Sequence, residues 1–258
     1  ISFTVPGVGS GGNAGVTGAT RIGNAASGDI IFSGANANAY NFGGALTVTS
    51  NGGAGAFQFT GADPTLTAGG AVTSTEGSGT DDTLVLADLK DLTITTASAN
   101  ANITLPNIDG TAGDGNDGTD LTILAGSGNV SVKSIDNDIN DLRIDGQTVT
   151  LTGAITTAAH NPGSADAASI DINGAAVIGA GITLTSGNGT VDFSGTVDSD
   201  NGENRALTIV SGSGATAING AVGTTDALGN LTINAAGTGA ITLSTVGCLL
   251  YTSPSPRD

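Results

Sequence analysis

The fold is decided by the stretch Asn230-Leu231-Thr232-Ile233-Asn234-Ala235-Ala236-Gly237-Thr238-Gly239-Ala240-Ile241-Thr242-Leu243. It holds two short segments of the form apolar-Thr-apolar, separated by small residues and glycine. Because side chains alternate between the two faces of a strand, Leu231 and Ile233 lie on one face and Thr232 on the other. One such unit cannot bury its apolar face alone, so the sequence predicts a β protein in which similar units stack.

Similar short strands are expected along most of the chain. We predict them at 29–32, 45–48, 56–59, 83–86, 91–94, 103–105, 121–123, 130–132, 142–144, 149–151, 170–172, 182–184, 191–193 and 207–209, with a further one at Ile218. Their anchor residues recur at short intervals. Leu121 and Leu142 are 21 residues apart, Leu207 and Leu231 are 24 apart, and Leu46 and Leu92 are 46 apart, which is about two such steps.

A period of about 20 to 25 residues that holds two or three short strands is typical of one coil of a parallel β-solenoid. We therefore predict an all-β fold, a parallel β-helix of about nine or ten irregular coils with Leu, Ile and Val stacked inside. Small residues and glycine would turn the chain at the corners. Antiparallel β-sandwich repeats are the alternative, since short strands at such spacing fit them too. Helices are not expected, because glycine interrupts nearly every window.

Composition and charge narrow the functional classes. The chain has 23 Asp and Glu against 6 Lys and Arg, a net charge of -17, which disfavours nucleic acids and anionic membranes as partners. It holds 43 Gly and no Trp or Met, but 38% hydrophobic residues indicate an ordered β protein rather than a disordered one. No run of about 18 apolar residues exists, so no transmembrane helix is expected in this segment.

Three segments are expected. Residues 1–28 are a weakly patterned start that forms a partial coil, residues 29–247 are the solenoid repeats, and residues 248–258 resemble translated sequencing adapter rather than natural sequence. The only cysteine, Cys248, lies in that tail, so the body can form no disulfide. The chain begins at Ile1 without Met, and we expect it to be an internal piece that continues into further repeats of a longer protein.

The units Asp120-Leu121-Thr122-Ile123 and Asn230-Leu231-Thr232-Ile233, with the link at 219–228, resemble degenerate repeats of very large bacterial surface proteins. These are the filamentous-haemagglutinin-like and autotransporter-passenger adhesins, and the likeness extends over about residues 30–247. The resemblance implies a right-handed β-helix and export to the cell surface or the extracellular medium. It also implies contact with a host surface, a neighbouring cell or a glycan.

We accordingly expect a non-catalytic structural stalk or adhesive segment, not an enzyme. His160 is the only histidine, and no triad or zinc cluster can be built around it. Carboxylates sit in turns, and we expect no position where two are desolvated together for acid-base chemistry. A carbohydrate-binding or pectate-lyase-like β-helix enzyme is the alternative, although Tyr40 and six Phe offer few aromatic platforms for sugars.

Calcium is the only cofactor that the sequence suggests. The segments 77–84 and 113–121 resemble the Gly/Asp nonapeptides of secreted toxins, and 198–204 resembles the start of an EF-hand loop. The nonapeptides stand alone rather than in tandem, and the third segment lacks an acidic twelfth ligand. Each loop is therefore either a solvated acidic turn or a weak calcium site. The candidate metal ligands are Asp81, Asp82, Asp114, Asp117, Asp198 and Asp200.

An outward row of threonines is a further expectation. Arg143 interrupts this row, and it lacks the regular Thr-x-Thr of an ice-binding face, so we interpret it as the polar side of the strands. The row comprises Thr47, Thr93, Thr122, Thr183, Thr208 and Thr232.

Overall fold

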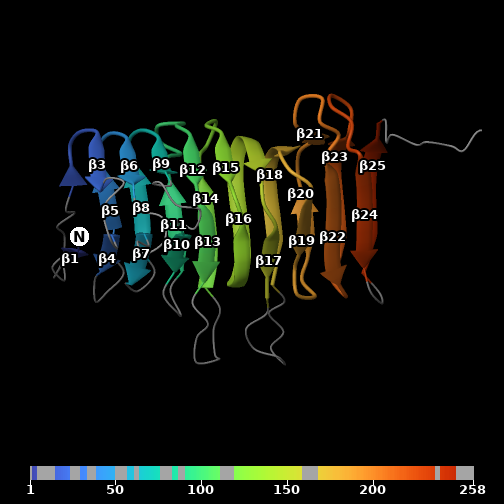
Figure 1. Ribbon diagram of the computed structural model, residues 1–258, viewed down its shortest axis with the longest axis horizontal. Coiled ribbons are helices and arrows are strands. Elements are labelled where there is room, and N and C mark those ends of the chain that lie inside the picture. Colours follow the sequence, from blue (N-terminus) through green and yellow to red (C-terminus); the bar gives the residue numbers. More distant parts are fainter. Residues whose placement is uncertain are drawn as a thin grey trace, which may run out of the picture.

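The computed structural model describes residues 2–4, 15–23, 30–33, 39–49, 57–60, 64–75, 83–86, 91–110, 119–158, 168–235 and 239–247. Their strands lie side by side along the long axis of an elongated molecule, from β1 at one end to β25 at the other (Figure 1). Every strand pairing among the described residues is parallel. The predicted parallel β-solenoid is confirmed, and the antiparallel alternative is wrong. The predicted count of nine or ten coils is not confirmed.

The strands are β1 (Ser2–Thr4), β2 (Gly15–Val16), β3 (Thr20–Gly23), β4 (Ile30–Ser33), β5 (Ala39–Phe42), β6 (Leu46–Thr49), β7 (Phe57–Thr60), β8 (Thr65–Ala68), β9 (Val72–Thr75), β10 (Thr83–Leu86), β11 (Leu92–Thr95), β12 (Ile103–Leu105), β13 (Asn107–Gly110), β14 (Thr119–Leu124), β15 (Val130–Val132), β16 (Ile135–Leu151), β17 (Ile155–Thr157), β18 (Ile170–Ile178), β19 (Ile182–Thr185), β20 (Val191–Phe193), β21 (Val197–Ser199), β22 (Ala206–Gly212), β23 (Thr216–Val222), β24 (Asn230–Ala235) and β25 (Ile241–Val246). Within residues 1–28, β1 to β3 pair with β4 to β6.

The pairings sort these strands into three parallel sheets. The first sheet holds β1, β4, β7, β10, β13, the start of β16, β17, β19, β22 and β24. The second holds β2, β5, β8, β11, β14, the middle of β16, the start of β18, β20, and the starts of β23 and β25. The third holds β3, β6, β9, β12, β15, the ends of β16 and β18, β21, and the ends of β23 and β25.

The core is a set of apolar columns that run from coil to coil. In the second sheet the column Leu92, Leu121, Leu142, Ile170 and Val191 is in register, and each side chain is buried. Burial of each aliphatic side chain contributes roughly 1.5 to 3 kcal/mol, so this stack is the main source of stability. Leu231 and Ile233 pack against the same core while Thr232 is exposed, as the alternation predicts.

Strands with apolar residues at alternate positions were predicted well. Those at 83–86, 103–105, 130–132 and 191–193 match the observed strands, and the predicted pairs 142–144 and 149–151 are both parts of β16. Sequence reasoning missed strands with fewer aliphatic residues. The missed strands are β1, β2, β3, β5, β8, β9, β13, β17 and β21.

The expected Leu46–Leu92 column and the expected threonine row are both wrong. The length of the sequence repeat does not show which of the three sheets a residue joins. Leu46 pairs with Thr20 and Val72 in the third sheet, whereas Leu92 lies in the second, so they are not two coils apart in one column. The predicted threonine row is divided in the same way among three sheets: Thr47 is in the third, Thr93 and Thr122 in the second, and Thr183, Thr208 and Thr232 in the first.

Coil length also varies more than expected. Val130 pairs with Val149, 19 residues later, while Val72 pairs with Ile103, 31 residues later. The inward columns keep their register over both intervals. A surface loop lengthens at small entropic cost, which explains why the repeat is irregular in sequence and regular in the core.

Glycine is required where turns of successive coils stack closely. A Cβ atom at Gly214 would lie 1.8 Å from the carbonyl oxygen of Gly189, in the turn directly below it. Asn188 in that turn holds the stack together, because its Oδ1 accepts the backbone N–H of Ser213 at 3.2 Å. A Cβ atom at Gly181, by contrast, would meet nothing within 4 Å.

The substitution Gly214→Ala tests this stacking. We expect it to lower the free energy of unfolding by about 1 to 3 kcal/mol, because the clash is with backbone that cannot rotate away. Gly181→Ala is the matched control and should leave stability within about 0.5 kcal/mol of the unmodified chain. Urea unfolding followed by circular dichroism measures both, and equal effects of the two substitutions would contradict the close contact.

Candidate functional site

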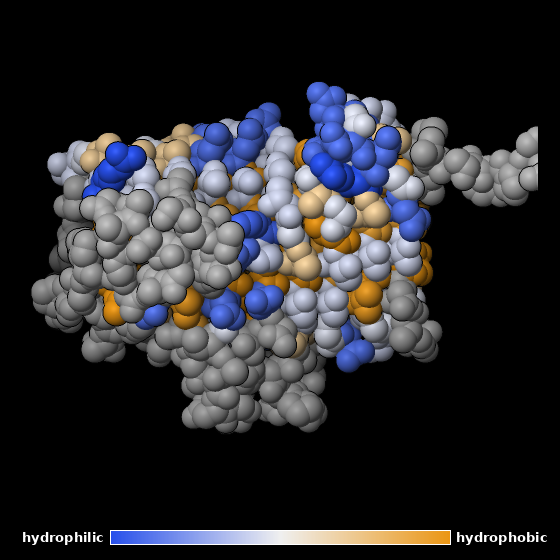
Figure 2. All heavy atoms as spheres, in the orientation of Figure 1, coloured by the Kyte–Doolittle hydropathy of each residue, from blue (hydrophilic) through white to orange (hydrophobic). Residues whose placement is uncertain are grey.

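The six candidate metal ligands fall into two groups. Asp81, Asp82, Asp114 and Asp117 lie outside the described residues, as does His160. Asp198 and Asp200 are described and lie at the end of β21. Strongly hydrophilic side chains gather at this part of the rod, over β21 at the top of Figure 2.

Asp198 has a structural partner of its own. Its side chain lies in β21 and is only 8% exposed. Its Oδ1 accepts the backbone N–H of Thr225 at 3.0 Å. This hydrogen bond ties β21 to the loop of the following coil. This carboxylate therefore satisfies a backbone donor that would otherwise lie unpaired next to β21.

The side chain of Asp200 is paired with the cationic side chain of Arg205, not with the side chain of Asp198. Its Oδ1 accepts the Nε–H of Arg205 at 3.2 Å, and Arg205 Nη2 lies 3.4 Å from Glu203 Oε2. The described residues contain no group of three or more His, Cys, Asp or Glu side chains arranged to hold a metal ion. Calcium binding by the acidic loops stays a prediction.

A carboxylate ladder that we did not predict runs along one edge of the second sheet. Asp91 Oδ1 accepts the backbone N–H of Asp120 at 3.2 Å, and Asp120 Oδ1 accepts that of Asp141 at 3.1 Å. Asp141 Oδ1 then accepts the backbone N–H of Ser169 at 2.8 Å and its hydroxyl at 2.6 Å. Each side chain thus caps a donor one coil further along.

The ladder places like charges close together. Burial raises the pKa of Asp120, and the neighbouring carboxylates of Asp91 and Asp141 raise it further, although the hydrogen bond from the Asp141 backbone opposes the shift. Asp120 and Asp141 are half-buried and Asp91 is exposed, and our expectation that no two carboxylates are desolvated together for acid-base chemistry stays a prediction. The sequence signal was present in the repeated Asp-Leu-x-Ile that begins at all three aspartates.

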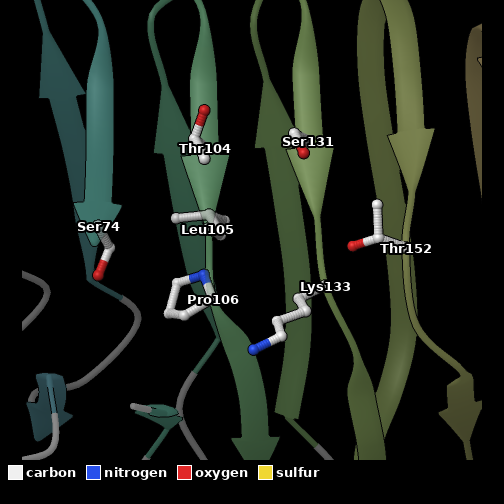
Figure 3. A pocket seen from close by; sticks show the side chains of 7 residues that line it. All are labelled: Ser74, Thr104, Leu105, Pro106, Ser131, Lys133 and Thr152. Atoms are coloured by element: carbon white, nitrogen blue, oxygen red, sulfur yellow. The ribbon is translucent and has the colours of Figure 1, made fainter. Parts of the chain in front are cut away.

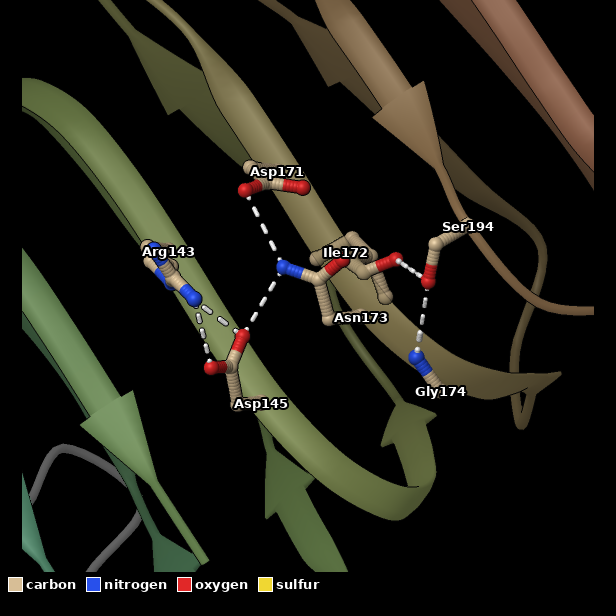
Figure 4. Close-up of polar contacts among 7 residues, drawn as sticks. All are labelled: Arg143, Asp145, Asp171, Ile172, Asn173, Gly174 and Ser194. Atoms are coloured by element: carbon tan, nitrogen blue, oxygen red, sulfur yellow. Dashed lines mark hydrogen bonds and ion pairs between the residues drawn. The ribbon is translucent and has the colours of Figure 1, made fainter. Parts of the chain in front are cut away.

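A second polar cluster lies on the outer face of the second sheet (Figure 4). Arg143 binds Asp145 through two contacts, Nη2 to Oδ2 at 2.8 Å and Nε to Oδ1 at 3.2 Å. Asn173 Nδ2 donates to Asp145 Oδ1 at 2.8 Å and to Asp171 Oδ2 at 3.0 Å. Burial, followed by repulsion from Asp171, raises the pKa of Asp192 in the next coil. These groups bind one another, which is the behaviour of a structural network.

An open groove of about 330 Å³ crosses the third sheet. Its lining comes from neighbouring coils, and the Lys133 side chain extends toward the strand of Pro106 (Figure 3). Hydroxyl groups dominate the polar lining. The lining residues are Ser74, Thr104, Leu105, Pro106, Ser131, Lys133 and Thr152.

The aromatic side chains that the structure describes are not available to this groove as sugar platforms. Tyr40, Phe32 and Phe59 are buried in the core, and the ring centroids of Phe32 and Phe59 are 5.2 Å apart. Phe42 and Phe193 are buried as well. Their role in the described part of the chain is packing.

Comparison with models of protein families, with curated proteins and with solved structures found no match. Among the residues that the structure describes, no helix is long and apolar enough to cross a membrane.

The substitution Asp120→Asn tests the carboxylate ladder. The amide oxygen can still accept the Asp141 N–H, while the repulsion disappears, so we expect stability at pH 7 to rise by up to about 1 kcal/mol. Because the folded-state pKa of Asp120 is raised, its destabilisation is present at neutral pH and vanishes as pH falls below the ordinary value of 3.8. The gain should therefore shrink on acidification.

Thermal unfolding at several pH values measures this gain. The exposed Asp136, changed to Asn, removes the same charge outside the ladder and is the matched control. A gain that is independent of pH, or one that Asp136→Asn reproduces, would show that Asp120 is not strained by its neighbours.

Proposed function

We propose that this chain is a segment of the non-catalytic stalk or adhesive region of a large secreted or surface-anchored bacterial protein. The supporting observation is the architecture: the inward columns are continuous along the described ladder, and each coil contacts mainly its neighbours. Such a rod lengthens by roughly 4.8 Å with every coil that is added. This is the property that a spacer needs to hold a binding region away from a surface.

The proposed rod is a right-handed β-helix of about nine or ten coils, since crossovers between parallel strands are right-handed in nearly all proteins. Its length would then be about 45 Å. We propose an extracellular or cell-surface location and further repeats in a longer parent chain, and no part in nucleic-acid binding, given the net charge of -17.

The outer face of the third sheet offers a row of uncharged polar side chains to a partner. In the third sheet, five hydroxyl side chains occupy one in-register row, formed by Thr47, Thr73, Thr104, Ser131 and Thr150. Such a row can donate and accept hydrogen bonds at the spacing of the coils. A glycan on a host or neighbouring cell is the partner that this chemistry fits best.

A second candidate function is carbohydrate binding or cleavage of the pectate-lyase type. The observation that favours it is the groove on the third sheet, where the Lys133 side chain extends toward Pro106 and the hydroxyls of Ser131 and Thr152 also line the groove. A lysine near a uronate could assist either binding or proton abstraction. We give preference to the stalk, because the groove holds no pair of acid and base groups among the residues that line it.

Small-angle X-ray scattering and an activity assay together test the stalk. Scattering from the full chain should show a rod of constant cross-section, and incubation with polygalacturonate should release no unsaturated product. A compact, rounded particle would contradict the stalk. Product that is formed by the full chain and lost in Lys133→Ala would show that the lyase alternative is right.

Thermal unfolding with and without millimolar calcium tests the acidic loops. Weak binding by the folded state would raise the melting temperature, since a ligand that binds only the native state stabilises it by mass action. We expect calcium, but not magnesium, to raise it, and Asp114→Asn combined with Asp117→Asn to remove the rise. Asp136→Asn is the charge control. No response to calcium would identify these carboxylates as solvated turns.

A further inference from the structure

Asparagine followed directly by glycine occurs five times in the chain, at residues 51–52, 173–174, 188–189, 201–202 and 219–220. In such a pair the backbone nitrogen of the glycine can attack the side-chain amide of the asparagine, because glycine has no side chain to keep the two groups apart. Asn51 lies outside the described residues. The other four pairs have the same local sequence, so any difference in their reactivity must come from the fold.

Two of the described pairs, at 173–174 and 219–220, lie within the strands β18 and β23. Asn173 Nδ2 donates to Asp145 Oδ1 at 2.8 Å (Figure 4), and Asn219 Nδ2 donates to Asp192 Oδ1 at 2.8 Å. Their glycines pack closely against an earlier coil, since a Cβ atom would lie 2.0 Å from a backbone oxygen in the first pair and 2.2 Å from one in the second. Neither pair can rearrange without breaking these contacts.

A third pair, at 188–189, is held in a stacked turn. Asn188 Oδ1 accepts the backbone N–H of Ser213 at 3.2 Å, which fixes the side-chain amide against the following coil. Gly189 is buried, and its backbone N–H donates to the carbonyl oxygen of Ser186 at 2.7 Å. Both the group that would be attacked and the nitrogen that would attack it are therefore engaged in hydrogen bonds.

The pair Asn201 and Gly202 differs from the other three on each of these points. It lies in the turn between β21 and β22, at the upper edge of the rod (Figure 1), and the backbone N–H of Glu203 closes this turn by donating to the carbonyl oxygen of Asp200 at 3.2 Å. Both residues of the pair are exposed, and a Cβ atom at Gly202 would meet nothing within 4 Å. Within the described part of the chain, the side-chain amide of Asn201 makes no hydrogen bond.

We propose that Asn201 is a site of spontaneous deamidation, and that it is the one of the four described pairs that the fold leaves reactive. The backbone nitrogen of Gly202 forms a bond to Cγ of Asn201, the bond from Cγ to Nδ2 breaks, and the amide proton of Gly202 leaves with Nδ2 as ammonia. Water then adds to one of the two carbonyl carbons of the resulting succinimide ring and opens it. The product at position 201 is aspartate or isoaspartate.

The modification adds a negative charge to a corner that is already acidic. Arg205 is the cation of this corner, with Nε 3.2 Å from Asp200 Oδ1 and Nη2 3.4 Å from Glu203 Oε2. Because the pair at 201–202 projects into open space, neither the new carboxylate nor the extra backbone methylene of isoaspartate disturbs the buried columns. Deamidation therefore adds to the net charge of -17 and to the repulsion between neighbouring rods, and leaves the core as it is.

Peptide mapping by mass spectrometry tests the site, on the full chain incubated at mildly alkaline pH. Each deamidation raises the mass of its peptide by about 1 Da. We expect Asn201 to convert at least about tenfold faster than Asn173, Asn188 and Asn219, because those three require local opening first. In denaturing urea the four should convert at similar rates, since only their shared local sequence remains. Similar rates in the folded chain, or a folded chain in which Asn201 stays unconverted while the unfolded chain reacts, would overturn the proposal.

The substitution Asn201→Gln provides the matched variant, because its longer side chain closes a ring far less readily. It should remove the mass gain from this peptide and leave the conversion of Asn51 unchanged. The melting temperature of the unmodified chain should not fall during conversion relative to that of Asn201→Gln treated in the same way. A mass gain that persists in the variant, or a fall in melting temperature that only the unmodified chain shows, would contradict a reactive turn that is independent of the core.

Discussion

The in-register stacking of inward aliphatic side chains is the interaction on which the rest of the structure depends. Leu121 is covered by Leu92 on one side and Leu142 on the other, and the same holds along each column. A single coil has no core of its own, so its stability comes from contacts with its neighbours. This explains why loops between strands vary in length while the ladders do not, and why an end coil presents apolar side chains.

Polar side chains at the corners keep successive coils in register. Several Asn and Asp side chains each accept a backbone N–H from the coil that follows. They are Asn100, Asn102, Asn188, Asp91, Asp120, Asp141 and Asp198. The amide side chain of Asn accepts this hydrogen bond without carrying a charge, whereas Asp carboxylates stacked in successive coils repel one another. Burial, and after it the neighbouring carboxylates of Asp91 and Asp141, raises the pKa of Asp120, so part of the acidic character of the chain serves structure at an energetic cost.

The sequence predicted much of the fold because two apolar residues on either side of one polar residue are a local signal. The strands 130–132 and 191–193 were found for this reason. Assignment to a sheet is not local, so Leu46 and Leu92 were placed in one column although they lie in different sheets. The carboxylate ladder could not be predicted for the same reason: Asp-Leu-x-Ile was visible, but its closeness in space depends on register across coils of unequal length.

The distribution of charge gives the molecule two kinds of surface with opposite consequences. Acidic and hydroxyl side chains on the sides of the rod hold water and keep neighbouring rods apart, as expected for a stalk that must not aggregate sideways. The stretch from Asn230 to Gly247 has no charge, and its strands carry the same alternation that covers every preceding coil. A further coil stacked on these strands would continue both the apolar columns and the backbone ladder.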